Sequence, residues 1–239
     1  MKKKVLYIIL TLALIFIIGG CDESESGGNE YEVQNIQMLN TIVNQKLDNF
    51  TCNCVSTITI NDTLNKEQIL QELKTTVDND KMHIILKEDE IKTELYQETE
   101  NDKIKYYINC ENSWEGPFEK IEFNPINFVA ILGFGEITED MFEYIEGVWV
   151  GNIEKLEEVL IPYFKEYIDN IAKEYECEIE LEKTQINKFN VEISNNKLKK
   201  ETIEIVLYCK KGNEQFSLSA KYIYNYSRIG TTLVEGPNQ

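Results

Sequence analysis

The sequence is poor in the residues that carry most nucleophilic and metal chemistry. Among its 239 residues it has one histidine, His83, and no Cys-x-x-Cys pair. A serine or cysteine nucleophile system would have to use His83 as its base, and a zinc site would need further ligands. No glycine-rich loop that could cradle a phosphate is present. We therefore predict no catalytic residue, no metal and no cofactor, and a protein that is not an enzyme. Of the three functions that we consider for this protein, catalysis is the least favoured.

Basic residues are also scarce, with 24 Lys and Arg against 42 Asp and Glu. Residues 1–20 contain three of the basic residues and none of the acidic ones, so the chain from Cys21 onward has a formal charge of −21. Affinity for nucleic acid depends on Lys and Arg neutralising phosphates, so nucleic acid is excluded as a partner. The acidic surface is interpreted as a solvated face that keeps the protein soluble, with attraction of cations or basic partners as the alternative.

The N-terminus has the pattern of an export signal. Lys2, Lys3 and Lys4 precede an apolar run, Val5 to Ile18, that only Thr11 interrupts. This run is shorter than the roughly 20 apolar residues that cross a bilayer. A basic start, a short apolar run and small residues are typical of a cleaved signal, which we place at residues 1–20.

The end of the run, Ile18-Gly19-Gly20-Cys21, resembles the lipobox of bacterial lipoproteins. The resemblance implies cleavage before Cys21, acylation of its sulfur, and display on the extracytoplasmic face of the cell membrane. Two acyl chains give a stable anchor where one does not. Residues 21–30 have no large apolar side chain and are predicted to be a flexible tether. The alternative is an uncleaved signal anchor in which Cys21 is an ordinary thiol.

After the tether, the apolar spacing changes from a helical to a strand period. Residues from Tyr31 to about Asp48 have the spacing of an amphipathic helix, and residues 50–61 alternate as a half-buried strand. Residues 67–77 fit both periods, and their β-branched end favours a strand. Asp78-Asn79-Asp80 is interpreted as a hairpin turn, because it lacks the glycine and distal glutamate of a calcium loop. Further strands are predicted at 82–86, 91–98 and 104–110, which together suggest an antiparallel meander.

The middle of the chain is predicted to be helical and its end to return to strands. Thr138 followed by two acidic residues suggests a helix N-cap, and 156–172 carries a helical stripe in which Pro162 kinks the helix or starts a second one. Strands are expected at 177–181, 203–209 and 216–226. The fold class is thus α+β: a single domain, 31–239, with a curved antiparallel half-barrel sheet wrapped over helices, an N-terminal helix and a central helical insertion at 124–174.

One face of the last strand is the candidate binding surface. It carries a row of large apolar and aromatic side chains: Phe216, Leu218, Tyr222, Tyr224 and Tyr226. Alternation of this kind usually reports core packing. The functional alternative is the lining of an apolar ligand cavity, where tyrosine rings cover the ligand and their hydroxyls bind polar groups.

Five cysteines follow Cys21, and all fall on apolar faces of the predicted strands: Cys52, Cys54, Cys110, Cys177 and Cys209. This favours buried small hydrophobes, although export permits disulfides. Cys52 and Cys54 lie roughly 6.6 Å apart along one strand, near the upper limit for a bridge, so they are not expected to pair. Free thiols and one internal disulfide both remain open.

The order of elements is similar to that of LolA-like half-barrel lipoproteins. The similar features are the helix before Asn49-Phe50, the meander with Lys105-Tyr106-Tyr107-Ile108, Asn112-Ser113-Trp114 in a turn, and the ending from Tyr222 to Thr232 followed by Pro237. The likeness is one of pattern over roughly residues 31–237. It implies an incomplete barrel around helices, and some family members carry lipid or lipoprotein acyl chains. We therefore expect a lipid-anchored protein that binds a lipid or other apolar ligand. The alternative is a protein-interaction module with a filled core, for which the sequence identifies no partner.

Overall fold

A computed structural model describes residues 36–45, 47–61, 66–88, 90–100, 103–110, 113–119, 135–163, 165–174 and 176–237. The predicted signal, Cys21 and the tether lie outside these residues. Within them, no helix combines the length and apolarity needed to cross a membrane.

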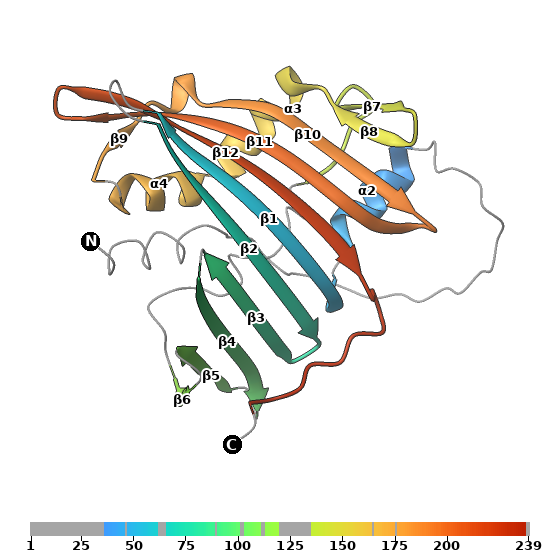
Figure 1. Ribbon diagram of the computed structural model, residues 1–239. Coiled ribbons are helices and arrows are strands. Elements are labelled where there is room, and N and C mark those ends of the chain that lie inside the picture. The colour runs from blue at the N-terminus through green and yellow to red at the C-terminus, as the bar shows by residue number, and fades with distance from the viewer. Residues whose placement is uncertain are drawn as a thin grey trace.

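The described chain forms one large, open and curved antiparallel sheet (Figure 1). Its twelve strands run in the order β6-β5-β4-β3-β2-β1-β12-β11-β10-β8-β7, and β9 pairs with β11 beside this path. The first meander, β1–β6, meets the later strands where β1 pairs with β12, from Thr51 opposite Ser227 to Asn61 opposite Ser217. The bounds are β1 Asn49–Asn61, β2 Lys66–Asp78, β3 Lys81–Glu88, β4 Ile91–Glu100, β5 Lys103–Cys110, β6 Ser113–Phe118, β7 Phe142–Ile145, β8 Val148–Gly151, β9 Glu178–Ile179, β10 Gln185–Ser194, β11 Lys197–Lys211 and β12 Glu214–Ser227.

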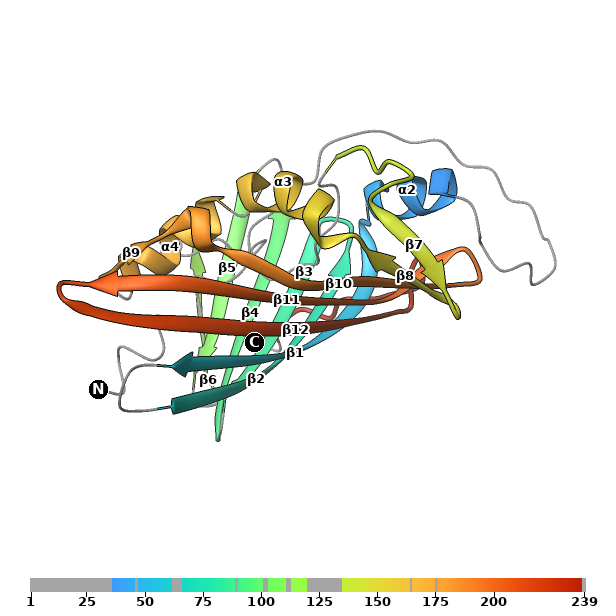
Figure 2. The same cartoon turned by 90° about the horizontal axis from the view of Figure 1, so that it is seen from above.

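Three short helices lie on one side of β10, β11 and β12 (Figure 2). They are α2 Ile36–Asn44, α3 Ile153–Tyr163 and α4 Lys165–Glu174. Pro162 lies in the last turn of α3, and α4 starts three residues later, which confirms the predicted break. Helix α2 contacts β11, α3 contacts β10 and α4 contacts β9.

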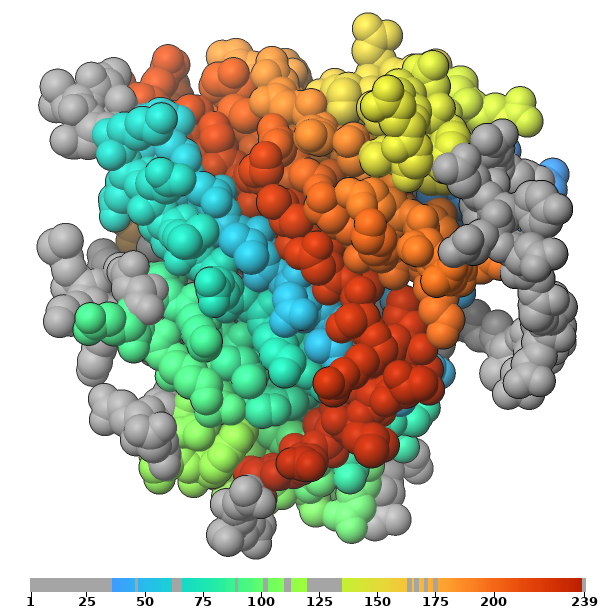
Figure 3. Space-filling model, turned by 45° about the vertical axis from the view of Figure 1, so that its right-hand side comes forward, coloured from blue at the N-terminus to red at the C-terminus, as the bar shows by residue number. Residues whose placement is uncertain are grey.

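Period-two alternation places the core on one face of the sheet, here called the inner face. It is exemplified by one row across five strands, in which each side chain lies directly opposite the next: Tyr226, Cys52, Thr75, Ile84 and Leu95. All five are buried. Residues between them, such as Asn53 and Asn225, are exposed on the other face. Figure 3 shows that outer face, with β12 in red running between the blue β1 and the orange β11.

Helix α3 packs against the inner face at Gly151, where β8 ends. A Cβ atom on Gly151 would lie 2.3 Å from Leu156 Cδ1 and 2.7 Å from the carbonyl oxygen of Phe189. These distances are far below van der Waals contact, so only glycine allows the helix to approach the sheet this closely.

The predicted strands 50–61, 67–77, 82–86, 91–98, 104–110, 203–209 and 216–226 are confirmed, as is the Asp78–Asp80 turn, in which Asn79 has φ of 50°. The first helix is also confirmed, although it ends at Asn44, before the expected boundary.

The helix predicted to begin at Thr138 is wrong. Met141 N–H donates to the Thr138 carbonyl at 3.1 Å, which closes a turn rather than starting a helix. A hairpin of β7 and β8 follows, with Glu146 and Gly147 at φ of 49° and 87°. The aromatic and β-branched residues of these strands favour extended backbone over the acidic cap signal. The helical insertion predicted at 124–174 is therefore reduced to α3 and α4, and its residues 124–134 lie outside the described chain.

One smaller prediction is confirmed only in part, another is wrong, and β10 is a further strand that the sequence did not predict. The strand predicted at 177–181 is confirmed only for Glu178 and Ile179, which form β9, because a 3-10 helix begins at Leu181. Ser113 and Trp114 begin β6 rather than forming a turn. Strand β10 was not predicted, since lysine and asparagine interrupt its apolar alternation.

Candidate functional site

The predicted aromatic face of β12 lies on the inner face of the sheet, between β1 and β11. Tyr222, Tyr224 and Tyr226 are each 8% exposed, Leu218 is 3% exposed, and Phe216 is half-buried. The rings of Tyr222 and Tyr224 stack with centroids 6.2 Å apart, and Tyr226 is tilted against Phe50 at the same centroid distance. The structure thus brings the five predicted residues together on one buried surface.

A fully buried acidic residue, Glu201 of β11, lies directly opposite Tyr224 on this surface. The Tyr226 hydroxyl donates a 2.6 Å hydrogen bond to Glu201 Oε2. The other carboxyl oxygen, Oε1, has no partner among the described residues. Burial raises the pKa of Glu201 to about 8, and the hydrogen bond from Tyr226 acts in the opposite direction. The carboxyl is therefore mostly protonated at neutral pH.

Sequence reasoning missed Glu201, although a signal was present. Counting back by two from Cys209 along β11 passes through Leu207, Ile205 and Ile203 and arrives at Glu201. An acidic residue in phase with an apolar face is a candidate buried carboxyl, which is rare unless it is hydrogen-bonded or functional.

The two cysteines next to these tyrosines, Cys52 and Cys54, have low reactivity. Cys52 lies opposite Tyr226 and Cys54 opposite Tyr224. Burial raises the pKa of Cys54 to about 12 and that of Cys52 well above its usual value. Thiols that stay protonated are poor nucleophiles, so these two act as small core side chains.

A second polar row crosses four neighbouring strands of the inner face. Tyr222 of β12 lies opposite Ser56, Ser56 opposite Gln71, and Gln71 opposite Glu88. Ser56 Oγ donates to Gln71 Oε1 at 3.1 Å, and Gln71 Nε2 donates to Glu88 Oε2 at 3.0 Å. All four residues are buried. This part of the interior is thus a hydrogen-bonded polar strip within an apolar surface.

Two further buried acceptors on the inner face lack partners among the described residues. They are Thr75 Oγ1 of β2 and Gln97 Oε1 of β4. Buried polar atoms are nearly always hydrogen-bonded in folded proteins. Together with Glu201 Oε1 they provide three acceptor positions that water or a ligand donor can occupy.

His83 lies on the outer face, away from the aromatic row. Its Nε2 is 3.0 Å from Glu94 Oε2, and its ring lies 6.0 Å from that of Trp114. Burial lowers the pKa of His83, opposed by the hydrogen bond to Glu94. Over the described part of the chain, no group of three or more His, Cys, Asp or Glu side chains could hold a metal ion.

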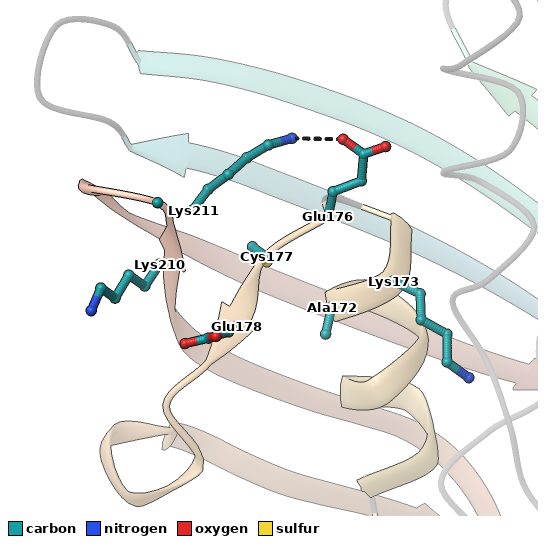
Figure 4. Close-up of a pocket in the computed structure, with 8 residues that line it drawn as sticks. Ala172, Lys173, Glu176, Cys177, Glu178, Lys210 and Lys211 are labelled. Carbon is teal, nitrogen blue, oxygen red and sulfur yellow. Dashed lines mark hydrogen bonds and ion pairs between the residues drawn. The ribbon is translucent and has the colours of Figure 1, made fainter.

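A cavity of about 480 Å³ opens at the far end of β11, next to α4 and β9 (Figure 4). The Lys211 ammonium lies 3.1 Å from the Glu176 carboxylate across it. None of the five predicted lining residues borders this cavity. Its lining consists of Ala172, Lys173, Glu176, Cys177, Glu178, Lys210, Lys211 and Gly212.

No protein-family model and no curated protein matches this sequence. The weakly similar solved structures include the following two. A DUF1329 family protein from Desulfovibrio piger is 8% identical, with a TM-score of 0.27, over 80% of this chain and 90% of that one. A putative outer membrane lipoprotein-sorting protein domain from Vibrio parahaemolyticus is 9% identical, with a TM-score of 0.23, over 80% of this chain and 88% of that one. The fold and the site described above stand on the chain's own geometry.

Proposed function

We propose that this protein is a membrane-anchored extracytoplasmic lipoprotein whose half-barrel domain binds a lipid or another apolar molecule without catalysis. The observation that carries the proposal is the inner face around β12. There, three tyrosines, a protonated glutamate and the hydrogen-bonded row of Ser56, Gln71 and Glu88 interrupt a mostly apolar buried surface. Ligand pockets typically combine a mostly apolar lining with a few polar groups that orient the ligand.

In this proposal the sheet wraps over α2, α3 and α4, and the ligand lies against the inner face. The rings of Tyr222 and Tyr224 cover an apolar part of the ligand. The acceptor atoms of Glu201 and Thr75 that lack described partners receive donors from a hydroxyl or amide of its polar end. The ligand is therefore an amphiphile rather than a pure hydrocarbon, because a hydrocarbon would leave these acceptors unsatisfied.

The anchor belongs to the same proposal. Lipid on Cys21 holds the domain at the membrane through the tether 21–30, and the strongly acidic composition keeps the domain itself off anionic headgroups. A ligand taken from the bilayer would then have a short path to the domain.

A second candidate function is a protein-interaction module with a filled core. It is favoured by the low exposure of Leu218 and the three tyrosines. The two candidates differ in one observable, which is whether the inner face admits a ligand.

Native mass spectrometry of the full chain, extracted in mild detergent, separates them. We expect co-purifying lipid on the natural protein and its loss in Tyr224→Ala, while Lys221→Ala, an exposed change on the outer face of the same strand, retains it. Binding of a dansyl-labelled fatty acid gives a second readout. A natural protein that carries no lipid and does not bind the dansyl probe refutes the carrier function and leaves the interaction module.

A further inference from the structure

The segment that joins α4 to β9 is held to the end of β11 by few interactions. Cys177 N–H donates to the Ala172 carbonyl at 2.9 Å, at the end of α4. The two residues of β9 then pair with β11, with Ile179 opposite Cys209. Only Glu180 N–H, which donates to the Tyr208 carbonyl at 2.9 Å, continues the ladder. A covalent link here would fix a weakly attached element.

Two free thiols lie side by side at this point. Cys177 directly precedes β9, in which Ile179 lies opposite Cys209, so the two cysteines lie at the same end of the β9–β11 pair. The two thiols are near enough to act on each other, since Cys209 lowers the pKa of Cys177 and Cys177 raises the pKa of Cys209. The two remaining cysteines whose side chains are described, Cys52 and Cys54, follow one another along a single strand instead.

The two thiols differ in access. Cys209 is buried at 2% exposure, whereas Cys177 is half-buried and lines the cavity of Figure 4. A small reagent or the active site of an oxidoreductase therefore reaches Cys177 first. The Lys211 ammonium at the same cavity favours the thiolate of Cys177, although burial keeps its pKa above the usual value.

We propose that Cys177 and Cys209 form an intramolecular disulfide when the protein meets an oxidising compartment, which joins the α4–β9 segment to β11. The oxidant is a disulfide, either of low molecular weight or in an exported oxidoreductase. The cellular part of the inference rests on the export included in the proposed function, whereas the chemistry of the pair does not.

The reaction has two exchange steps. The Cys177 thiolate attacks one sulfur of the oxidant, a mixed disulfide forms, and the first oxidant thiolate leaves. Burial raises the pKa of Cys209 to about 12, so its proton must pass to a base before it can attack. The Cys209 thiolate then attacks the Cys177 sulfur, the new bond forms, and the second oxidant thiolate leaves. Two electrons pass to the oxidant, and the two cysteine protons protonate its thiolates or the solvent.

The test uses the reduced full chain in mild detergent, treated with oxidised glutathione at pH 8. Peptide mapping without reductant should find one linked pair of peptides, containing Cys177 and Cys209 and lacking two hydrogen atoms. The bridge closes a loop of about 30 residues, so we expect the Tm to rise by about 5–15 °C and to fall again when dithiothreitol is added. The same linked peptides should appear in protein alkylated at the moment of isolation from cells.

Cys177→Ser and Cys209→Ser should each abolish both the linked peptides and the rise in Tm. Cys54→Ser, a buried change elsewhere on the inner face, should retain both. The proposal is overturned if glutathione remains on Cys177 as a mixed disulfide, or if both thiols are alkylated in freshly isolated protein. Peptide mapping of the natural chain decides this even where a serine variant folds poorly. The lipid content measured for the proposed function is independent of either result.

Discussion

Burial of Glu201 predicts that the protein loses stability as the pH rises through neutrality. The pKa of this carboxyl is about 8 in the folded protein and close to 4.5 in the unfolded chain. Below pH 4.5 both states hold the proton, and the contribution of Glu201 to stability is at its maximum. Between pH 4.5 and 8 the unfolded chain releases the proton while the folded protein keeps it, so the free energy of unfolding falls. Above pH 8 both states are ionised and the loss is complete.

The magnitude follows from the two pKa values. Each pH unit between them lowers the free energy of unfolding by about 1.4 kcal/mol, which amounts to about 5 kcal/mol in total and about 3 kcal/mol at pH 7. This is a large part of the 5–15 kcal/mol that typically stabilises a folded protein. Glu201→Gln has nearly the same shape and cannot ionise, so it should remove the whole pH-dependent term.

The assay is urea unfolding followed by circular dichroism from pH 4 to pH 9. We expect Glu201→Gln to be less stable than the natural protein by about 1 kcal/mol at pH 4.5, because its amide brings an extra buried donor. The order should reverse between pH 5 and 6, and the variant should be clearly the more stable protein at pH 8.5. Glu204→Gln is the matched control, because Glu204 lies on the outer face of the same strand, 2.8 Å from Lys221, where an ion pair contributes less than about 1 kcal/mol. If the natural protein and Glu201→Gln give parallel curves across this range, the carboxyl is not buried as described.

Three further changes have defined outcomes. Tyr226→Phe removes the hydrogen bond that stabilises the ionised form of Glu201, so it should cost about 1–3 kcal/mol and move the same pH transition upward in the unfolding series. Gly151→Ala should cost about 1–3 kcal/mol in urea unfolding, because its Cβ meets both α3 and backbone, whereas Gly236→Ala, whose nearest contact is 3.5 Å, should be close to neutral. Cys21→Ser should move the protein from the membrane to the soluble fraction on immunoblots, and unchanged retention would contradict the lipid anchor.

The sequence predicted most of the sheet, because a strand with one buried face repeats every two residues. In β12 the period is unbroken from Leu218 to Tyr226, and the buried side chains are those on the predicted face. The same argument succeeds for β1 and β11. It fails for β10, because a register shift places two polar residues, Asn187 and Lys188, between the apolar Ile186 and Phe189 and so breaks the alternation.

The prediction of a helix from Thr138 was wrong because it relied on a helix-cap signal and not on the strand-forming residues that follow. Thr138 followed by acidic residues satisfies the rule for a helix start. The next residues, however, include Phe142 and Trp149, which are both buried in a hairpin that extends the sheet beyond β10. Tertiary packing of these aromatics decides the local conformation, and a cap signal of a few residues contains no information about it.

For the candidate site, the alternation predicted which side chains face inward, but it did not identify the residue with the unusual chemistry. Alternation placed Tyr222, Tyr224 and Tyr226 on the inner face, yet the residue that gives this face its chemistry came from the neighbouring strand. Tyr226 and Glu201 are 25 residues apart and meet only because β11 and β12 form a hairpin. Such a pair can be found only when the register between the two strands is known, and periodicity alone does not give that register.

Taken together, the two polar features of the inner face narrow the kind of ligand that the proposed function requires. Burying the row of Ser56, Gln71 and Glu88 has a desolvation cost that apolar residues would not have. In a protein that needs only a filled core, the row would therefore lower the stability without any benefit. The protonated Glu201 adds a donor as well as an acceptor on the other side of β12. An interior that binds only hydrocarbon chains gains nothing from either feature. A ligand with a neutral, hydrogen-bonding end and an apolar body satisfies both, and the loss of binding above pH 8, where Glu201 ionises, would be its signature.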